Sequence, residues 1–152
     1  MLSKISALAL LAASVSAAPA GFCQAPAPWT WEIHGFSSVC TAATCRYSFN
    51  VSGPPGPSGQ PSFDASGCAG TSVQSGFKSC SQVRVDVPGD VQAQEFNHGI
   101  DIGASISVQY TFEQNGVKYT YTGNNSVAHT GNGPAVEFTI IPTEVFAVPS
   151  EA

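Results

Sequence analysis

One alternating run of side chains, interrupted by a single Asn-Gly pair, constrains the fold of this chain more than any other feature. Between residues 104 and 112, apolar and polar side chains alternate strictly, which indicates a strand with one buried face. Asn115-Gly116 follows, and Asn-Gly is the preferred pair for a two-residue type I′ hairpin turn. Such a turn predicts the facing pairs Glu113 and Lys118, Thr111 and Thr120, Phe112 and Tyr119, and Tyr110 and Tyr121. Opposite charges and Thr–Thr then share one face and aromatic rings the other, whereas a one-residue slip would mismatch every pair.

Shorter segments with the same period of two surround this hairpin. Strands are expected at residues 29–34, 45–51, 83–87, 126–130, 136–141 and 145–148. Residues 61–77 are expected to hold one or two short strands, and residues 91–99 either a short strand or a helical turn. Because no helix-period run of ten or more residues follows residue 17, we predict an all-β fold. The expected architecture is a single compact antiparallel β-barrel or β-sandwich, stapled by disulfides.

Residues 53–60 read GPPGPSGQ and interrupt this series of strands. Proline and glycine at this density continue neither a strand ladder nor a helix. We expect an exposed loop there, extended and mobile.

The first 17 residues have the order of parts of a secretory signal peptide. Lys4 precedes an apolar stretch over residues 5–15, and small residues up to Ala17 suit a signal peptidase. The apolar stretch is well short of the roughly 20 residues that a membrane-spanning helix needs. We therefore expect a signal peptide at 1–17 and a single secreted, extracellular β domain at 18–152. Its four basic and ten acidic side chains give a net charge of −6, which disfavours nucleic acid and anionic membranes as partners.

Five cysteines fall in the exported part, and an oxidising compartment makes disulfides their default state. The preferred pairing closes a tight loop with Cys40 and Cys45 and a second loop with Cys68 and Cys80. Cys23 is then a free thiol or forms an intermolecular bond. Pairing of Cys23 with Cys68 or with Cys80 stays open. A metal site is disfavoured, because the chain has no CxxC motif and no histidine at a zinc-finger spacing.

Motifs for catalysis or cofactor binding are missing from the sequence. Sequons for N-glycosylation begin at Asn50 and Asn124. Glu95, His98 and Asp101 form the only cluster of carboxylates and histidine, but their spacing fixes no geometry for a glycosidase pair. We interpret these three as solvated loop residues. The chain has neither a G-x-S-x-G elbow nor a phosphate-binding glycine loop.

Two tryptophans and two isolated histidines remain. Trp29 and Trp31 suit a sugar-binding platform, but their alternation with Ile33 favours packing in the core. His34 and His129 are each expected on a solvated strand face.

Three stretches of sequence resemble a known family. They are W-T-W-E-I-H-G-F-S-S-V-C, then C-R-Y-S-F-N-V, and near the end E-F-T-I-I-P-T-E-V-F-A-V. Together they resemble small secreted fungal elicitors of the plant hypersensitive response and, more distantly, the β-barrel major mould allergens. The resemblance covers the whole mature chain and implies a compact antiparallel β-barrel or sandwich. It also implies release from a fungus and detection by plant cells as an inducer of cell death and defence.

The same resemblance bears on partners and chemistry. It implies recognition by a plant cell-surface or apoplastic protein, and it brings no catalytic residue and no cofactor. In the allergen branch an N-terminal cysteine outside two internal bridges links two subunits, and Cys23 stands at a comparable place. The resemblance therefore implies a homodimer through Cys23.

A non-enzymatic secreted elicitor or effector is accordingly the leading hypothesis for function. One alternative is a small-ligand carrier with an apolar barrel cavity lined by Tyr110, Phe112, Tyr119 and Tyr121. Another is a cell-wall glycan binder or enzyme that uses Glu95 and Asp101.

Overall fold

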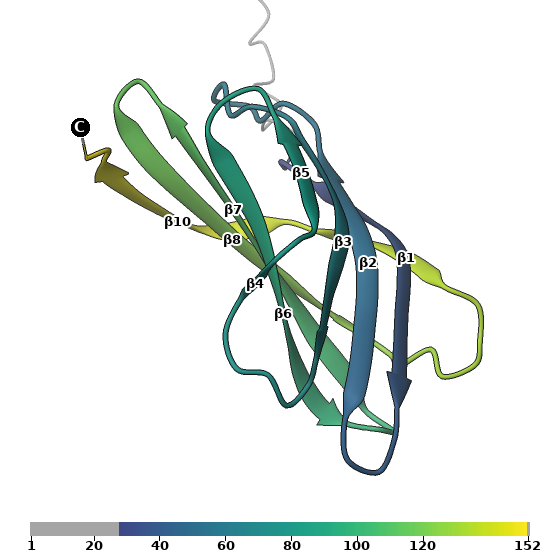
Figure 1. Ribbon diagram of the computed structural model, residues 1–152. Coiled ribbons are helices and arrows are strands. Elements are labelled where there is room, and N and C mark those ends of the chain that lie inside the picture. Colours follow the sequence, from purple (N-terminus) through teal and green to yellow (C-terminus); the bar gives the residue numbers. More distant parts are fainter. Residues whose placement is uncertain (1–27, 152) are drawn as a thin grey trace, which may run out of the picture.

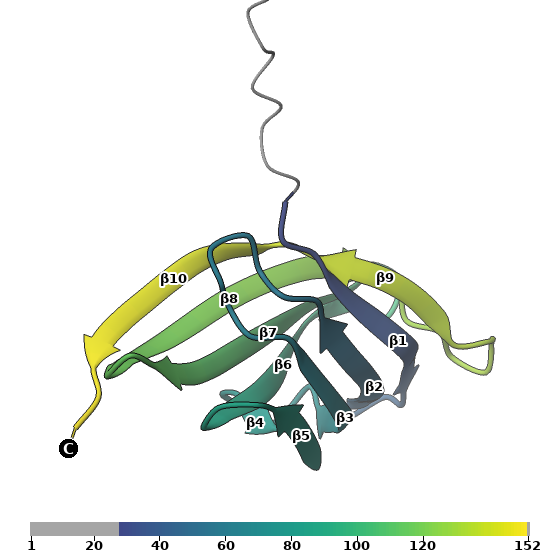
Figure 2. The same ribbon diagram turned by 90° about the horizontal axis from the view of Figure 1, so that it is seen from above.

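Two antiparallel β-sheets pack face to face in the computed structural model, which describes residues 28–151 (Figures 1 and 2). The first sheet has the strand order β5-β3-β2-β1-β9 and the second the order β10-β8-β7-β6-β4. The strands are β1 (Trp31–Cys40), β2 (Cys45–Gly53), β3 (Phe63–Thr71), β4 (Lys78–Ser79), β5 (Gln82–Val85), β6 (Gly89–Gly99), β7 (Gly103–Gln114), β8 (Val117–Val127), β9 (Val136–Ile140) and β10 (Pro142–Pro149). The sheets are separate, so of the two expected all-β architectures the fold is the sandwich. The predicted signal peptide and Cys23 lie outside the described residues.

The predicted hairpin is confirmed in the pairing of β7 with β8. All four predicted pairs are partners in the register, from Glu113 facing Lys118 to Tyr110 facing Tyr121. Asn115 and Gly116 have φ angles of 53° and 74°, the left-handed region that a type I′ turn requires at both positions.

The left-handed turn yields a first prediction. Gly116→Ala is expected to lower the free energy of unfolding by about 1 kcal/mol, because a Cβ is disfavoured at positive φ. Gly116→Asn should lose less, since asparagine tolerates this region. The space around Gly116 is open, so no clash contributes to the difference. Urea denaturation of both variants provides the measurement, and equal stabilities of the Ala and Asn variants would contradict the turn assignment.

Several expected strands differ in extent from the observed ones. Residues 89–99 form one long strand, β6, so a helical turn at 91–99 is wrong. Residues 126–130 do not form a separate strand, because β8 continues only to Val127 and a loop follows. Residues 61–77 contain β3, and the two-residue β4 comes after them. One residue, Ile141, connects β9 to β10, and at this point the chain passes from the first sheet to the second.

Aromatic side chains fill the space between the sheets. Trp31 is fully buried and makes edge-to-face contacts with Trp29, Phe63 and Tyr110, whose ring centroids lie 5.4, 5.5 and 6.4 Å away. The expected core role of Trp29 and Trp31 is confirmed. Phe112 is buried against Tyr110, so these rings pack the interior and give no support to a cavity lined by them.

The loop at residues 53–60 is exposed along most of its length, as expected, but hydrogen bonds near both ends hold it to the core. Trp29 Nε1 donates a hydrogen bond to the Pro54 carbonyl at 2.8 Å. Gln60 is buried, and its amide donates to the Tyr121 hydroxyl at 3.0 Å. Between these anchors the chain turns, with the Gly56 amide donating to the Gln60 carbonyl. Five of its eight residues are exposed as predicted, namely Pro54, Pro55, Pro57, Ser58 and Gly59.

Both expected internal disulfides are present. Cys40 is bonded to Cys45, where the two cysteines face each other across β1 and β2. Cys68 of β3 is bonded to Cys80, which lies between β4 and β5. The alternative pairings of Cys23 with Cys68 or Cys80 are therefore wrong. Two disulfides fit an extracellular protein.

Within residues 28–151 no helix is long and apolar enough to cross a membrane.

Three loops gather at one end of the sandwich, at the foot of Figure 1. They are the β1–β2 loop at 41–44, the β3–β4 loop at 72–77 and the β6–β7 turn at 100–102. The Ser72 amide donates to the Cys45 carbonyl, and Asn97 near the β6–β7 turn contacts Cys45. We call this region the hairpin end.

Candidate functional site

A group of polar side chains lies inside the sandwich at the hairpin end, where the inner faces would otherwise be apolar. Alternation along β1, β2 and β6 turns these side chains inward, and a loop after β8 adds one more. The group, which we call the polar layer, consists of Ser38, Tyr47, Glu95, Asn97 and His129.

Glu95 is the most unusual member of the polar layer. It follows Val91 and Ala93 on the inner face of β6 and is only 4% exposed. Neither carboxylate oxygen has a hydrogen-bond partner among residues 28–151, and both are shielded from solvent. Burial raises the pKa of Glu95 above its ordinary value, because a charged carboxylate is poorly solvated there. Buried carboxyl groups without partners are rare in folded proteins and often mark functional positions.

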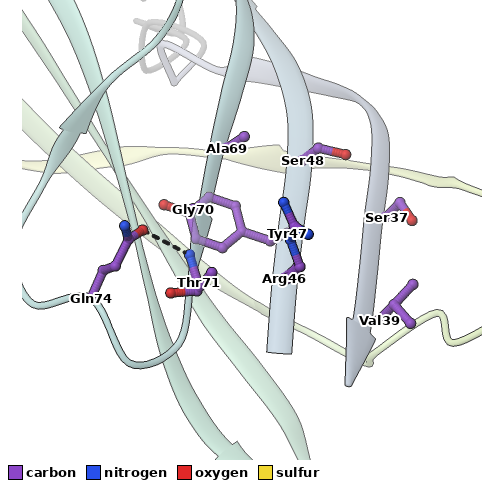
Figure 3. A pocket seen from close by; sticks show the side chains of 9 residues that line it. All are labelled: Ser37, Val39, Arg46, Tyr47, Ser48, Ala69, Gly70, Thr71 and Gln74. Carbon is purple, nitrogen blue, oxygen red and sulfur yellow. Dashed lines mark hydrogen bonds between the residues drawn. The ribbon is translucent and has the colours of Figure 1, made fainter. Parts of the chain in front are cut away.

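Tyr47 reaches across the interior from the first sheet to the second. Its hydroxyl donates to the Ala93 carbonyl at 3.3 Å. Figure 3 shows the Tyr47 ring beside Gly70, its partner on β3. A Cβ at Gly70 would lie 2.7 Å from the phenol oxygen, so only glycine leaves room for this ring. Burial, and after it the charge of Glu95, raise the pKa of Tyr47 to about 12.

His129 and Asn97 surround the Cys40–Cys45 disulfide. The Nδ1 atom of His129 lies 2.7 Å from the Ser38 hydroxyl, and Nε2 lies 3.9 Å from Cys45 Sγ. The Asn97 amide donates to the same sulfur at 2.8 Å. His129 was expected to be isolated on a solvated strand face, and this is wrong. It belongs to a loop held to β1 by hydrogen bonds between the backbones of Thr130 and Ser38.

The predicted cluster of Glu95, His98 and Asp101 does not assemble. Glu95 faces the interior, whereas His98 lies on the opposite face of β6 and Asp101 lies in the β6–β7 turn. His98 and Asp101 are exposed, as expected, and His98 Nε2 lies 2.8 Å from the Ser105 hydroxyl. The expectation of a solvated side chain is wrong for Glu95, because inward alternation along β6 places it in the interior.

The remaining predicted positions lie on the surface. Asn50 is exposed on β2, where its side-chain oxygen accepts a hydrogen bond from the Gly67 amide at 3.0 Å. Asn124 is exposed on β8, so both sequons are accessible. His34 is exposed on β1, as expected, and lies 3.9 Å from the Glu137 carboxylate.

Apolar side chains project into solvent from the loops of the hairpin end. Val73, Ile100 and Ile102 are 71%, 62% and 74% exposed. We call these three residues the apolar tip. Isolated exposed apolar side chains are ordinary, but several on neighbouring loops of a rigid scaffold are typical of interaction surfaces.

Beside the apolar tip, the outer face of the first sheet is hollowed. The hollow has a volume of about 570 Å³ and is lined by residues of β1, β2 and β3, among them the small polar side chains of Ser37, Ser48 and Thr71 (Figure 3). Of the described residues that line it, Arg46 alone is charged, and Gln74 of the β3–β4 loop lies at one side, where it accepts a hydrogen bond from the Thr71 amide. An arginine bordered by exposed apolar groups is a frequent composition of protein-binding surfaces.

Comparison with known proteins adds no relative. No protein family, curated protein or solved structure matches the chain.

The chemistry of the hairpin end and the polar layer is therefore inferred from the side chains of the chain itself. Burial raises the pKa of Glu95, but its two oxygens are shielded from solvent and so from any substrate in this conformation. The accessible groups of the hairpin end include the apolar tip, Arg46 and the exposed carboxylate of Asp101. Exposed apolar side chains beside an arginine are typical of surfaces that bind proteins.

Proposed function

We propose that this protein is a secreted elicitor or effector, which triggers hypersensitive cell death and defence in plants by being recognised at its hairpin end. The observation that carries the proposal is the apolar tip, displayed on loops that a disulfide and two β-sheets hold rigid. A rigid binding surface loses little conformational entropy on association. The resemblance of the sequence to small secreted fungal elicitors supports the same function.

The interior of the molecule supports a role at the surface. Trp31, Phe63 and Tyr110 occupy the space that a carried ligand would need. Glu95 faces the interior of the sandwich, whereas Asp101 lies exposed in the β6–β7 turn, so the two carboxylates do not flank one cleft as a glycosidase pair would. The proposal therefore includes no enzymatic step.

The partner is proposed to be a plant cell-surface or apoplastic protein. Its contact site should offer apolar pockets for the tip and a carboxylate for Arg46, because a buried guanidinium needs a charged partner.

For Cys23, the resemblance predicts a bond between two copies of this chain. A band at twice the monomer mass on a non-reducing gel, which Cys23→Ser removes, is the expected result.

Infiltration of the purified protein into leaves tests the proposed function. The folded protein should cause local cell death and defence-gene induction, and the same protein reduced, alkylated and unfolded should not. Circular dichroism establishes that the first sample is folded. A folded sample that causes neither response would refute the proposed function.

A further inference from the structure

We propose that the Cys40–Cys45 pair, once reduced, binds one Zn²⁺ ion together with His129. The two sulfurs and a ring nitrogen of His129 all lie within 4.8 Å of one another. The ligand atoms of a tetrahedral zinc site with sulfur and nitrogen ligands lie about 3.5–3.8 Å apart. The distance of 3.9 Å from Cys45 Sγ to His129 Nε2 is close to this range, so His129 and Cys45 need little relative movement, whereas the two sulfurs move apart once the S–S bond opens.

The imidazole of His129 is already oriented for such a role. Its Nδ1 atom lies 2.7 Å from the hydroxyl of Ser38, which is fully buried. A neutral imidazole that donates from Nδ1 keeps the lone pair on Nε2, the atom that faces Cys45. Metal-bound histidines commonly donate their second nitrogen to a fixed oxygen in this way.

Asn97 supplies a second supporting contact. Its amide nitrogen donates to Cys45 Sγ at 2.8 Å, while its amide oxygen accepts from the Gly99 backbone at 2.7 Å. The bond to Gly99 fixes which end of the amide faces the sulfur. A donor at this place stabilises the thiolate, which is the form of cysteine that binds metal.

The scaffold keeps the two thiols together after reduction. Cys40 and Cys45 are direct partners in the register of β1 and β2, and the Thr41 amide donates to the Thr44 carbonyl within the loop. Ser72 also binds the Cys45 amide through its hydroxyl at 2.9 Å. The two cysteines therefore remain neighbours without the S–S bond.

A route for the ion is also present. A surface hollow of about 300 Å³ is lined by both cysteines, Asn97 and Ile100. The protein supplies three ligands, so a water molecule from this hollow would complete a tetrahedral site.

The site forms in two steps, reduction of the Cys40–Cys45 disulfide followed by binding of Zn²⁺. A dithiol reductant supplies two electrons and two protons, so the S–S bond breaks, two cysteine thiols form and the reductant closes into its own disulfide. Zn²⁺ then displaces the two thiol protons into solvent. His129 is 84 residues from Cys45 in the sequence, which is why zinc-finger spacing did not reveal the site.

Equilibrium titration with Zn²⁺ under anaerobic conditions tests the site. The protein carries Cys23→Ser throughout and is compared in its oxidised state and after treatment with a phosphine, which brings no competing thiol. Four samples are titrated: this parent, His129→Ala, Cys40→Ser/Cys45→Ser and the matched control Cys68→Ser/Cys80→Ser. A chromophoric chelator reports free Zn²⁺, and near-ultraviolet circular dichroism reports the fold.

The reduced parent and the Cys68/Cys80 control should each bind one Zn²⁺, and the oxidised parent none. His129→Ala should weaken binding by at least about 10-fold, and Cys40→Ser/Cys45→Ser should abolish it. The proposal would be overturned if His129→Ala bound Zn²⁺ as tightly as the parent, or if the folded, reduced parent bound no Zn²⁺. If reduction unfolds the parent, adding Zn²⁺ should restore the near-ultraviolet signal of the parent but not that of His129→Ala. If Zn²⁺ restores the signal of neither protein, the proposal is equally overturned.

Discussion

Glu95→Gln is expected to raise the free energy of unfolding at neutral pH by about 1–3 kcal/mol, because it removes a buried charge and leaves only a neutral amide unpaired. The wild-type side chain is 4% exposed, and within residues 28–151 neither of its oxygens has a hydrogen-bond partner. Glutamine has nearly the same shape and carries no charge, so it removes the cost of burying a carboxylate.

The effect of Glu95 should depend on pH in a defined direction. Burial raises its pKa in the folded protein above the ordinary value of 4.5 that applies to the unfolded chain. Protonation therefore stabilises the fold. This stability is fully present below pH 4.5 and is lost as the pH rises through the folded-state pKa. The two proteins should have similar stabilities at low pH and diverge above it.

Urea denaturation across pH 4–8 measures this difference. Other groups titrate alike in both proteins, so the difference curve isolates Glu95. The matched control is Glu113→Gln, an exposed carboxylate opposite Lys118, which should change stability by no more than about 0.5 kcal/mol. A stability difference between Glu95→Gln and wild type that does not vary with pH would show that Glu95 is not a buried, titrating carboxyl.

Trp31→Ala should be the most destabilising single substitution considered, with a loss of about 3–5 kcal/mol. Trp31 is fully buried and contacts three other aromatic rings, so truncation leaves a large cavity between the sheets. Total stabilities of domains are commonly about 5–15 kcal/mol, so the variant would lose a large share.

Two comparisons make the Trp31 result specific to packing. Trp31→Phe should lose much less than Trp31→Ala, because it keeps a ring and removes an indole N–H that has no partner in the described part of the chain. Phe146→Ala, on the exposed edge strand β10, should change stability by no more than about 0.5 kcal/mol. Chemical denaturation measures all three, and a nearly neutral Trp31→Ala would show that this ring is not part of the core.

Local patterns in the sequence were sufficient for the hairpin and favoured the correct disulfides, although the pairing of Cys68 with Cys80 had alternatives that only the structure removes. The Asn115-Gly116 turn fixes a register that involves only neighbouring residues, and Cys40 and Cys45 are close in the chain. Residues 91–99 were ambiguous because their inner face carries Glu95 as well as Val91 and Ala93. A charged residue on a buried face hides the alternation by which a strand is detected.

The polar layer depends on contacts that a local pattern cannot contain. His129 meets Ser38 and Cys45 only because the loop after β8 packs against β1, about 90 positions earlier in the chain. The choice between barrel and sandwich likewise depends on where the chain changes sheets, and a single residue, Ile141, separates β9 from β10. Both features follow from tertiary packing.

We propose that the hairpin end is the surface that plant cells recognise. Ile100→Ser/Ile102→Ser removes two side chains of the apolar tip that contribute little to the core, since they are 62% and 74% exposed. The matched control, Val145→Ser/Phe146→Ser, makes the same kind of change on β10, where these side chains are 59% and 67% exposed.

Leaf infiltration over a range of doses compares both variants with wild type, after circular dichroism has shown all three to be folded. We expect the tip variant to need at least about 10-fold more protein for the same area of cell death, which corresponds to a loss of about 1.4 kcal/mol in binding. The β10 control should match wild type. A tip variant as potent as wild type would contradict the claim that the hairpin end is recognised.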